Sequence, residues 1–349
     1  MKILSPAGSY GSAIAAIDAG ADAVYLGLRS IKHQRSRCVN FSIEELKDIV
    51  RIADEKDVEI NVTFNSSYNE ENFESIRAQL DTLDDIGVDS IIISDIGLIE
   101  TIRDEHPRIK IAFSVQGQCS NSDFGDILKG YGVHKLVLDR NISIDEAKRI
   151  KEKTGLEVEM FAFGFQCYSQ DSICYMGDYF AGEPCNVQCT QKVWFSDTDA
   201  RARFFFMKFQ SALKYIPNLI ESGIDYVKIE GRQRSSRYVS EITKVFREAI
   251  DSYKDNPRSY AVKKEWMKTL ERQAYHFEVT DSFYEPFKYR REIISDPSMK
   301  NAYMYLKDIS SSFMETRNSM KIVKELKNAA RIQFLEPKRA RKHDFSDLE

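Results

Sequence analysis

A short phrase that recurs four times along the chain constrains the fold more than any other feature. Each copy consists of a helix end, a glycine, a small apolar residue, a polar residue and a short apolar run, at residues 18–27, 85–95, 130–140 and 221–232. The glycine supplies the left-handed residue that ends a helix. The Val- and Ile-rich run after it is typical of a parallel strand that is buried on both faces. The repeat therefore predicts helices that alternate with parallel strands.

Further strands and helices fill the gaps between these copies. Apolar runs predict four more strands, at residues 2–7, 58–65, 110–116 and 157–164. Apolar residues at helical spacing predict helices at residues 42–57, 69–87, 143–155, 211–223 and 235–253. The first of these helices starts with the capping-box pair Ser42 and Glu45, in which each side chain accepts a hydrogen bond from the other residue's backbone.

Eight strands that alternate with helices over residues 1–255 predict an α/β fold, a (β/α)8 barrel of the TIM type. The competing architecture is a doubly wound open sheet. Such a sheet usually has about five or six strands and a glycine-rich phosphate-binding turn after the first strand. Here the first strand leads into "SPAGSYG", which lacks the G-x-G-x-x-G spacing. The sequence therefore favours the closed barrel.

The domain organisation follows from where this alternation stops. We predict a barrel at residues 1–255 with a cysteine-rich insertion at about 165–210, followed by a C-terminal extension at 256–349. Helical patterns at residues 266–277 and 313–330 make this extension mostly helical. Its charged end, "EPKRARKHDFSDLE", is typical of a solvated tail.

Composition indicates a soluble protein without a transmembrane segment. Of the 349 residues, 42% are hydrophobic and 30% are charged, and the formal net charge is −4. No apolar run approaches the roughly 20 residues that cross a bilayer. The N-terminus lacks the basic segment and the uninterrupted apolar core of a signal peptide. We therefore expect a cytoplasmic protein, and disulfides rarely persist in the cytoplasm.

The cysteines gather in loops that follow predicted strands. Four of the six lie after the seventh strand: Cys167, Cys174, Cys185 and Cys189. Cys38 and Cys119 follow the second and fifth strands. Barrel enzymes carry their active sites on these loops, so the clustering indicates a functional site. An iron–sulfur cluster, a zinc site and buried thiols remain open, and the compartment disfavours a disulfide.

Polar residues near the strand ends are candidates for substrate binding. Lys228, Glu230 and Arg232 alternate along "VKIEGR" and therefore share one face of a strand, which points either into a functional barrel mouth or into an internal ion pair. Arg232, at the end of the strand, could bind a carboxylate through two hydrogen bonds. The same end of the barrel should carry further candidates, whose alternative role is to cap loops: Asn65, Gln116 and Arg140. Two arginines at the start of the next helix could bind anions or face water: Arg234 and Arg237.

Three stretches of the chain are similar to a known protein family. "LSPAGSYGSAIAAIDAGADAVYLGL", "FAFGFQCYSQDSICYMGDYFAGEPCN" and "DYVKIEGRQRSSRYVSEITKVFREAID" resemble the collagenase-like peptidase family U32, and the resemblance covers roughly residues 1–255. Within this family the similarity points to the ubiquinone-biosynthesis branch, the UbiU and UbiV type. The resemblance implies a 4Fe–4S cluster and an oxygen-independent hydroxylation, with a prephenate-type molecule as the hydroxyl donor.

The resemblance also implies cluster ligands, a substrate and a partner. Cys167, Cys174 and Cys189 match the first three cluster ligands of this branch, and Cys185 takes the place of the fourth, with Cys38 as the alternative. The substrate would be a quinone precursor, and a UbiV-like subunit would be the partner. Other branches of the family hydroxylate a base in transfer or ribosomal RNA, and a nucleic-acid substrate is therefore the alternative.

Two further alternatives are a U32-type peptidase and a zinc-stabilised binding module. The chain has neither H-E-x-x-H nor G-x-S-x-G, the motifs that place a zinc ligand pair or a nucleophilic serine. For a zinc module, only "CNVQC" has the spacing of a zinc knuckle. Both readings are therefore weaker than hydroxylation.

Overall fold

Contacts divide the chain into two compact units, residues 1–186 with 207–289 and residues 187–206 with 290–349. The computed structural model describes residues 1–31, 38–66, 68–165, 167, 192–194, 201–203, 208–275 and 277–281. In the second unit, the described residues form one antiparallel pair of strands, β8 (Lys192–Trp194) and β9 (Arg201–Arg203). All other described elements belong to the first unit.

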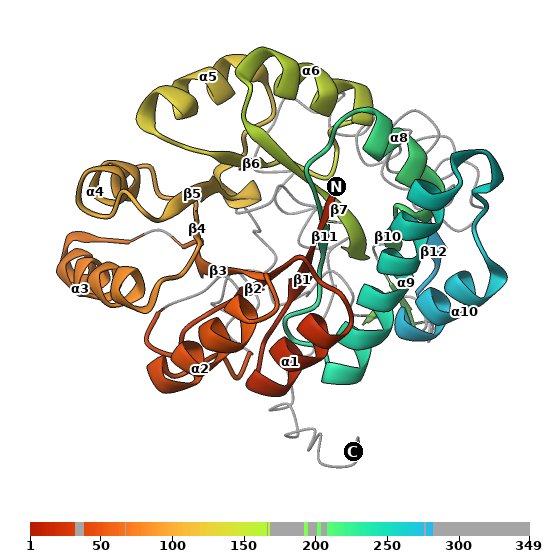
Figure 1. Ribbon diagram of the computed structural model, residues 1–349, viewed down its shortest axis with the longest axis horizontal. Coiled ribbons are helices and arrows are strands. Elements are labelled where there is room, and N and C mark those ends of the chain that lie inside the picture. The colour runs from red at the N-terminus through yellow and green to blue at the C-terminus, as the bar shows by residue number, and fades with distance from the viewer. Residues whose placement is uncertain are drawn as a thin grey trace, which may run out of the picture. The chain divides into compact units, whose positions relative to one another are not determined.

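Eight parallel strands of the first unit close into a barrel (Figure 1). In their order around the barrel they are β1 (Lys2–Pro6), β2 (Ala23–Leu26), β3 (Glu59–Phe64), β4 (Ser90–Ile93), β5 (Lys110–Phe113), β6 (Lys135–Val137), β7 (Glu157–Phe165) and β11 (Tyr226–Ile229). Strand β11 pairs with β1 on one side and with β7 on the other, and this double pairing closes the ring. The predicted barrel and its eight strands are confirmed.

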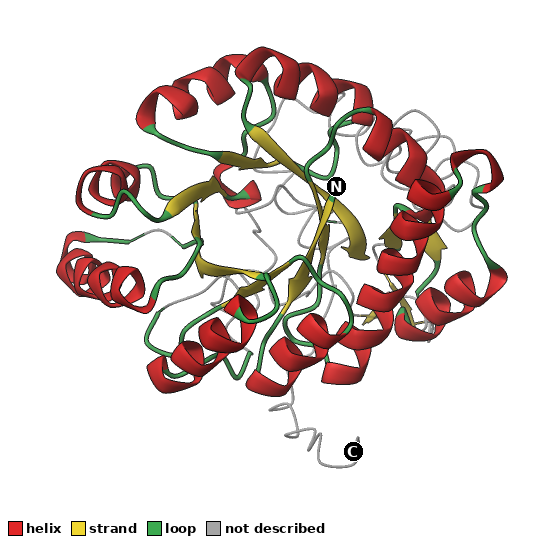
Figure 2. Cartoon of the chain, viewed as in Figure 1, coloured by secondary structure: helices red, strands yellow, loops and turns green. Residues whose placement is uncertain are grey.

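Helices surround the barrel (Figure 2). They are α1 (Tyr10–Asp18), α2 (Ile43–Asp54), α3 (Glu70–Ile86), α4 (Gly97–Glu105), α5 (Ser122–Tyr131), α6 (Ile144–Thr154), α8 (Ile216–Glu221) and α9 (Ser236–Asp255), with α10 (Lys264–Gln273) packed on α9. Short 3-10 turns are η1 (Val115–Gly117), η3 (Leu213–Tyr215) and η4 (Pro257–Ser259). Helix α2 begins with the predicted capping box of Ser42 and Glu45. Within the described part of the chain, no helix has the length and apolar character needed to cross a membrane.

The glycines of the repeated phrase end helices, as the sequence predicts. These four glycines follow helices and adopt positive φ angles of 87°, 87°, 103° and 71°: Gly20, Gly87, Gly132 and Gly223. An L-residue with a side chain rarely adopts this conformation. Each glycine therefore ends one helix and turns the chain back toward the next parallel strand.

Two apolar regions, one outside and one inside the barrel, hold the first unit together. The larger lies between the strands and the surrounding helices and contains side chains such as Ile3, Val62 and Leu136. Two smaller clusters are formed by alternate residues of the strands and the loop after β5: Leu4, Ala23, Tyr25, Ile92, Ala112 and Tyr226 in one, and Val115, Val137 and Phe161 in the other. Because side chains alternate between the two faces of a strand, these smaller clusters lie inside the barrel.

Four described elements differ from the sequence-based expectation. Strand β10 (Phe209–Ser211) pairs antiparallel with β7, and β12 (Val279–Thr280) pairs with β10. The helix expected at 211–223 begins only at Ile216, because Ser211 still belongs to β10 and the helix has a proline in its first turn. The helix expected at 266–277 is α10 and ends at Gln273, whereas the one expected at 313–330 lies outside the described residues.

Candidate functional site

The carboxyl-terminal ends of the barrel strands, with the loops that follow them, form what we call the mouth. Arg232 follows β11 and crosses to two other strands: its Nη1 donates to Thr63 Oγ1 on β3 at 3.0 Å, and its Nη2 donates to Asn40 Oδ1 at 2.6 Å. Asn40, in the loop after β2, has a φ of 58°, which asparagine tolerates better than most residues. The Arg232 side chain is thus fixed at the mouth, with 8% of the residue exposed.

Gly8 allows the loop after β1 to lie directly on Arg232. A Cβ at position 8 would lie 1.7 Å from the backbone oxygen of Arg232, which no side chain can fit. The backbone oxygen of Gly8 also accepts a hydrogen bond from the Asn40 N–H at 2.8 Å. The "SPAG" segment therefore holds both Arg232 and its partner Asn40 in place.

A second arginine, Arg140, forms an ion pair at the mouth. Its Nη1 lies 3.3 Å from Glu230 Oε2, and its guanidinium carbon lies 3.7 Å from the ring centre of Phe161. The same Glu230 oxygen accepts a hydrogen bond from the backbone N–H of Phe165 at 3.1 Å. The predicted residues Arg140 and Glu230, 90 positions apart in the sequence, are thus neighbours.

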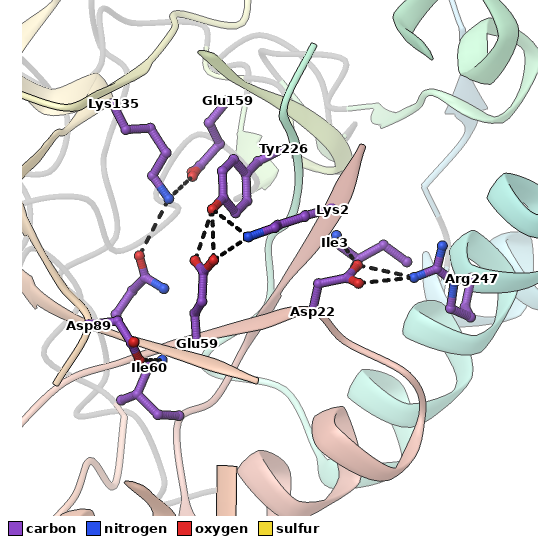
Figure 3. Close-up of polar contacts among 11 residues, drawn as sticks. Lys2, Ile3, Asp22, Glu59, Ile60, Asp89, Lys135, Glu159, Tyr226 and Arg247 are labelled. Atoms are coloured by element: carbon purple, nitrogen blue, oxygen red, sulfur yellow. Dashed lines mark hydrogen bonds and ion pairs between the residues drawn. The ribbon is translucent and has the colours of Figure 1, made fainter. Parts of the chain in front are cut away.

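Lys228 lies one layer deeper, inside the barrel, where it forms a triad with Glu159 and Lys135. Lys228 Nζ donates to Glu159 Oε1 at 2.9 Å. Lys135 Nζ lies 3.2 Å from Glu159 Oε2, and Figure 3 shows this second contact. Burial alone would raise the pKa of Glu159, but the two lysines outweigh it and lower that pKa. Burial lowers the pKa of Lys228 although Glu159 acts in the opposite direction. With all three groups ionised, the triad carries one excess positive charge.

The opposite end of the barrel is closed by a second polar cluster, which Lys135 connects to the triad (Figure 3). Lys2 and Tyr226 both donate to the carboxylate of Glu59, and Lys135 Nζ lies 3.9 Å from the ring centre of Tyr226. Burial alone would raise the pKa of Glu59, but its hydrogen bonds with Lys2 and Tyr226 lower it. These residues begin β1, β3 and β11 and therefore seal the amino-terminal end, which leaves the mouth as the functional end.

The two predicted amide residues also lie at the mouth, and each has a buried oxygen that lacks a hydrogen-bond partner. Asn65 follows β3, and Gln116 lies in η1 after β5. Among the described residues, no donor reaches Asn65 Oδ1 or Gln116 Oε1, and the hydroxyl of neighbouring Ser66, which is 4% exposed, has no partner either. Buried polar atoms normally have partners, so these three groups point to a ligand or water at the mouth.

The described cysteines lie in loops after strands, as predicted. Cys38 follows β2, Cys119 follows β5, and Cys167 comes two residues after the end of β7. Burial raises the pKa of Cys119 to about 11, and its thiol donates to the Asn121 oxygen at 3.7 Å, as a core thiol would. Cys174, Cys185 and Cys189 lie outside the described residues, and the cluster site stays a prediction. Across the described ranges, no three His, Cys, Asp or Glu side chains form a metal site.

Sequence reasoning missed four residues that hold the predicted ones: Glu159, Lys135, Asn40 and Thr63. Glu159 and Lys135 were detectable by the same signal as Lys228, a charged residue within an otherwise apolar strand. Asn40 and Thr63 gave no such signal, because polar residues are common in loops and at strand ends. Their role depends on Arg232 reaching across the closed barrel.

Comparison with known proteins places the chain in a family. Residues 8–293 match the family model described as peptidase family U32. The chain belongs to the U32 family. The predicted family is thereby confirmed, and the matched range contains every candidate residue at the mouth.

Three proteins that are similar to this chain carry different functional names. The tRNA hydroxylation protein P1 of Bacillus subtilis (strain 168) is 30% identical over 321 residues, which cover 87% of this chain and 76% of that protein. The 23S rRNA 5-hydroxycytidine C2501 synthase of Escherichia coli (strain K12) is 27% identical over 264 residues, 72% of this chain and 39% of that protein. A protein named collagenase from Porphyromonas gingivalis is 26% identical over 277 residues, 72% of this chain and 66% of that protein.

These names favour one of the sequence-based alternatives. The two hydroxylation proteins act on RNA by name, so the similarity supports the RNA alternative better than the quinone interpretation. The described histidines give no support to the peptidase activity that the collagenase name suggests. His134 directly precedes β6, and His106 follows α4, so both lie at the end of the barrel opposite the mouth.

Proposed function

We propose that this protein hydroxylates a base in RNA without using dioxygen, and that the mouth of the barrel is where the base binds. The similarity over 87% of the chain to a tRNA hydroxylation protein carries this proposal. In such a reaction a hydroxyl group passes from a donor molecule to a carbon of the base, and that carbon's hydrogen passes to the donor. The chain's part is to hold base and donor together and to exclude water.

The chemistry of the mouth supports a planar polar substrate together with an anionic donor. The oxygens of Asn65 and Gln116 and the hydroxyl of Ser66 are available to N–H groups on the edge of a base, as amide side chains are in other RNA-binding sites. Arg232 is held rigid by Asn40 and Thr63, and a fixed guanidinium suits a carboxylate. The proposed substrate-binding role extends to Lys228, Glu230 and Arg140. The lysine and the arginine add positive charge around Arg232, and Glu230 orients Arg140 through their ion pair.

A 4Fe–4S cluster is the cofactor we propose for the same site. Cys167 lies two residues after the end of β7, at the mouth, and Cys174, Cys185 and Cys189 would complete the ligand set, with Cys38 as the alternative fourth ligand. Thiolates are the ligands that such clusters require. When bound, the cluster would supply one-electron transfer or a Lewis-acidic iron.

Iron analysis of cysteine variants tests the cofactor. Protein purified without oxygen should contain about four irons and as many sulfides per chain, and Cys174→Ala should lose most of them. Cys119→Ala is the matched control and should keep its iron, because that thiol is buried with a raised pKa. A colourless protein with one zinc per chain would instead support the zinc-stabilised module.

Deletion of the gene tests the substrate. Nucleosides from transfer and ribosomal RNA of the deletion strain should lack one hydroxylated base, and a plasmid copy should restore it. Quinones extracted from the same cells should be unchanged. Normal RNA together with an accumulated quinone precursor would overturn the proposal in favour of the quinone interpretation, in which the chain would work with a UbiV-like subunit. Normal RNA and normal quinones would contradict both.

A further inference from the structure

One arginine near the mouth lies among aromatic rings instead of pairing with a carboxylate. Arg234 lies in the loop between β11 and α9, and its guanidinium carbon is 4.9 Å from the ring centre of Tyr275 and 5.5 Å from that of Tyr238. The ring centres of Phe165 and Phe209 are each 5.8 Å away. The four rings come from α9, β7, β10 and the turn after α10, so distant segments converge on this side chain.

The guanidinium of Arg234 has no acceptor in the described part of the chain. No carboxylate there lies within 4.0 Å of it, whereas Arg140 pairs with Glu230 and Arg237, three residues further on, pairs with Glu241 at 2.9 Å. Contact with ring faces leaves the N–H groups of a guanidinium available for hydrogen bonds. Arg234 is partly exposed, and it can therefore donate to an anion from solution.

Tyr275 presents an exposed ring beside this guanidinium. It is 57% exposed, and its backbone, two residues after the end of α10, has a φ of 59°. Glycine or asparagine usually occupies a position of this kind, because a bulky residue is strained there. Strain of this sort is found where a side chain serves a function that packing alone does not explain.

The location links this pair to the mouth. Phe165, one of the rings around Arg234, is the last residue of β7, and its N–H donates to Glu230 at the mouth. Cys167 follows two residues later. The N-terminus of the 20-residue helix α9 begins at Ser236, two residues after Arg234, and its positive dipole end adds to the attraction for an anion.

We propose that Arg234 and Tyr275 bind single-stranded RNA next to the base that is hydroxylated. Arg234 donates to a backbone phosphate, and a neighbouring base stacks on Tyr275. This inference rests on the proposed function and adds to it the residues that hold the strand. Phosphate contacts by arginine and base stacking on exposed aromatics are the two interactions by which proteins hold single strands.

Binding of a fluorescent single-stranded RNA to the full-length protein tests the pair. Arg234→Ala should weaken binding about 5- to 30-fold and reduce the slope of log affinity against log salt by about 0.7, because one phosphate contact is lost. Tyr275→Asn, which suits the left-handed backbone, should weaken binding about 5- to 100-fold without changing that slope. Arg51→Ala is the control and should bind like the wild type, because Arg51 lies on the surface of α2 and pairs with Asp48 and Glu55.

The outcomes separate this inference from the proposed function. If deletion of the gene leaves RNA unchanged, the proposed function itself is wrong. If deletion removes the hydroxylated base but Arg234→Ala and Tyr275→Asn bind RNA and restore the base like the wild type, only this inference is wrong. Circular dichroism and thermal unfolding show whether each variant is folded, and Arg234→Lys, which keeps the charge, should retain most of the salt slope.

Discussion

Glu159 is the residue on which the interior of the barrel depends. It is fully buried, and it is the carboxylate that both Lys135 and Lys228 contact. Removing the charge of Glu159 leaves the buried ammonium groups of Lys135 and Lys228 without this carboxylate. Removing Lys228 instead leaves Glu159 and Lys135 as a neutral ion pair. The two substitutions should therefore differ in their effect on stability.

Glu159→Gln should lower the free energy of unfolding by about 3–5 kcal/mol, because it leaves buried charge uncompensated. Lys228→Met should change it by only about 1 kcal/mol or less, since Met fills the space against Tyr25 and Phe161 and the pair of Glu159 with Lys135 stays neutral. Urea unfolding measures both values.

Glu152→Gln is the control for this comparison, since Glu152 lies on the surface with only a long contact to Lys148 at 3.9 Å. Its effect should stay within about 0.5 kcal/mol. If Lys228→Met destabilised the protein as much as Glu159→Gln, then Lys228 would be a structural partner and the excess positive charge would have no functional meaning.

The close contact between Gly8 and the Arg232 backbone gives a second prediction for a single residue. Gly8→Ala should lower the free energy of unfolding by about 2–4 kcal/mol, because the new Cβ collides with the Arg232 backbone and the loop must move. Gly130→Ala is the matched control: no atom lies within 4 Å of a Cβ at this position, and because position 130 is an exposed site in α5 the change should stabilise by about 0.5–1 kcal/mol. Equal thermal stability of the Gly8→Ala variant and the wild type would contradict the close contact.

At the scale of elements, the packing of α10 on α9 is held by Glu241. Its carboxylate accepts hydrogen bonds from Arg237 on α9 at 2.9 Å and from Arg272 and Gln273 on α10 at 2.7 and 2.6 Å. Burial alone would raise the pKa of Glu241, but these three donors lower it to about 2. Since Tyr275 lies two residues after the end of α10, this network also positions the ring that we propose to contact RNA.

Glu241→Gln should therefore loosen α10. Amide hydrogens of α10 should exchange up to about five-fold faster, while those of the barrel strands stay unchanged, because the network is local and largely solvated. Hydrogen exchange followed by mass spectrometry measures this. Glu271→Gln, at an exposed position of the same helix, should leave exchange unaltered, and unaltered exchange in Glu241→Gln would show that the network contributes nothing to docking.

The same carboxylate gives the docking a pH dependence. Because the folded pKa of about 2 lies below the ordinary value of 4.5, the folded state favours the ionised form. The contribution of Glu241 is therefore complete above pH 4.5 and is lost as the pH falls toward 2. The difference in α10 exchange between the wild type and Glu241→Gln should shrink over that range, and a difference that was as large at pH 2 as at pH 7 would contradict the assignment.

Most elements, but only part of the site, could be predicted from the sequence. The strands and helices follow from local patterns, since a left-handed glycine such as Gly87 and an apolar run are both read within a few residues. Strands β10 and β12, with three and two residues, carry too little pattern to be detected, whereas the equally short β6 follows one of the repeated glycines. Arg232 could be placed at the mouth because it ends a strand, but its partners Asn40 and Thr63 depend on how the barrel closes, which no local pattern encodes.

At the scale of the whole molecule, the distribution of charge matters more than its sum. The chain has a formal net charge of −4, which gives no general attraction to RNA. Arg140, Arg232 and Arg234 nevertheless lie at or beside the mouth, with Lys228 beneath them. A local positive region on an acidic protein suits a substrate that binds at one place and is released elsewhere.

The most direct test of the account is the content of hydroxylated nucleosides in RNA from cells grown without oxygen. The cells lack the chromosomal gene and carry the wild-type chain, Arg232→Ala or an empty plasmid, and mass spectrometry quantifies the nucleosides. We expect the wild type to restore one hydroxylated base, Arg232→Ala to restore about a tenth of it or less, and the empty plasmid none. The same hydroxylated bases in all three strains would contradict the account.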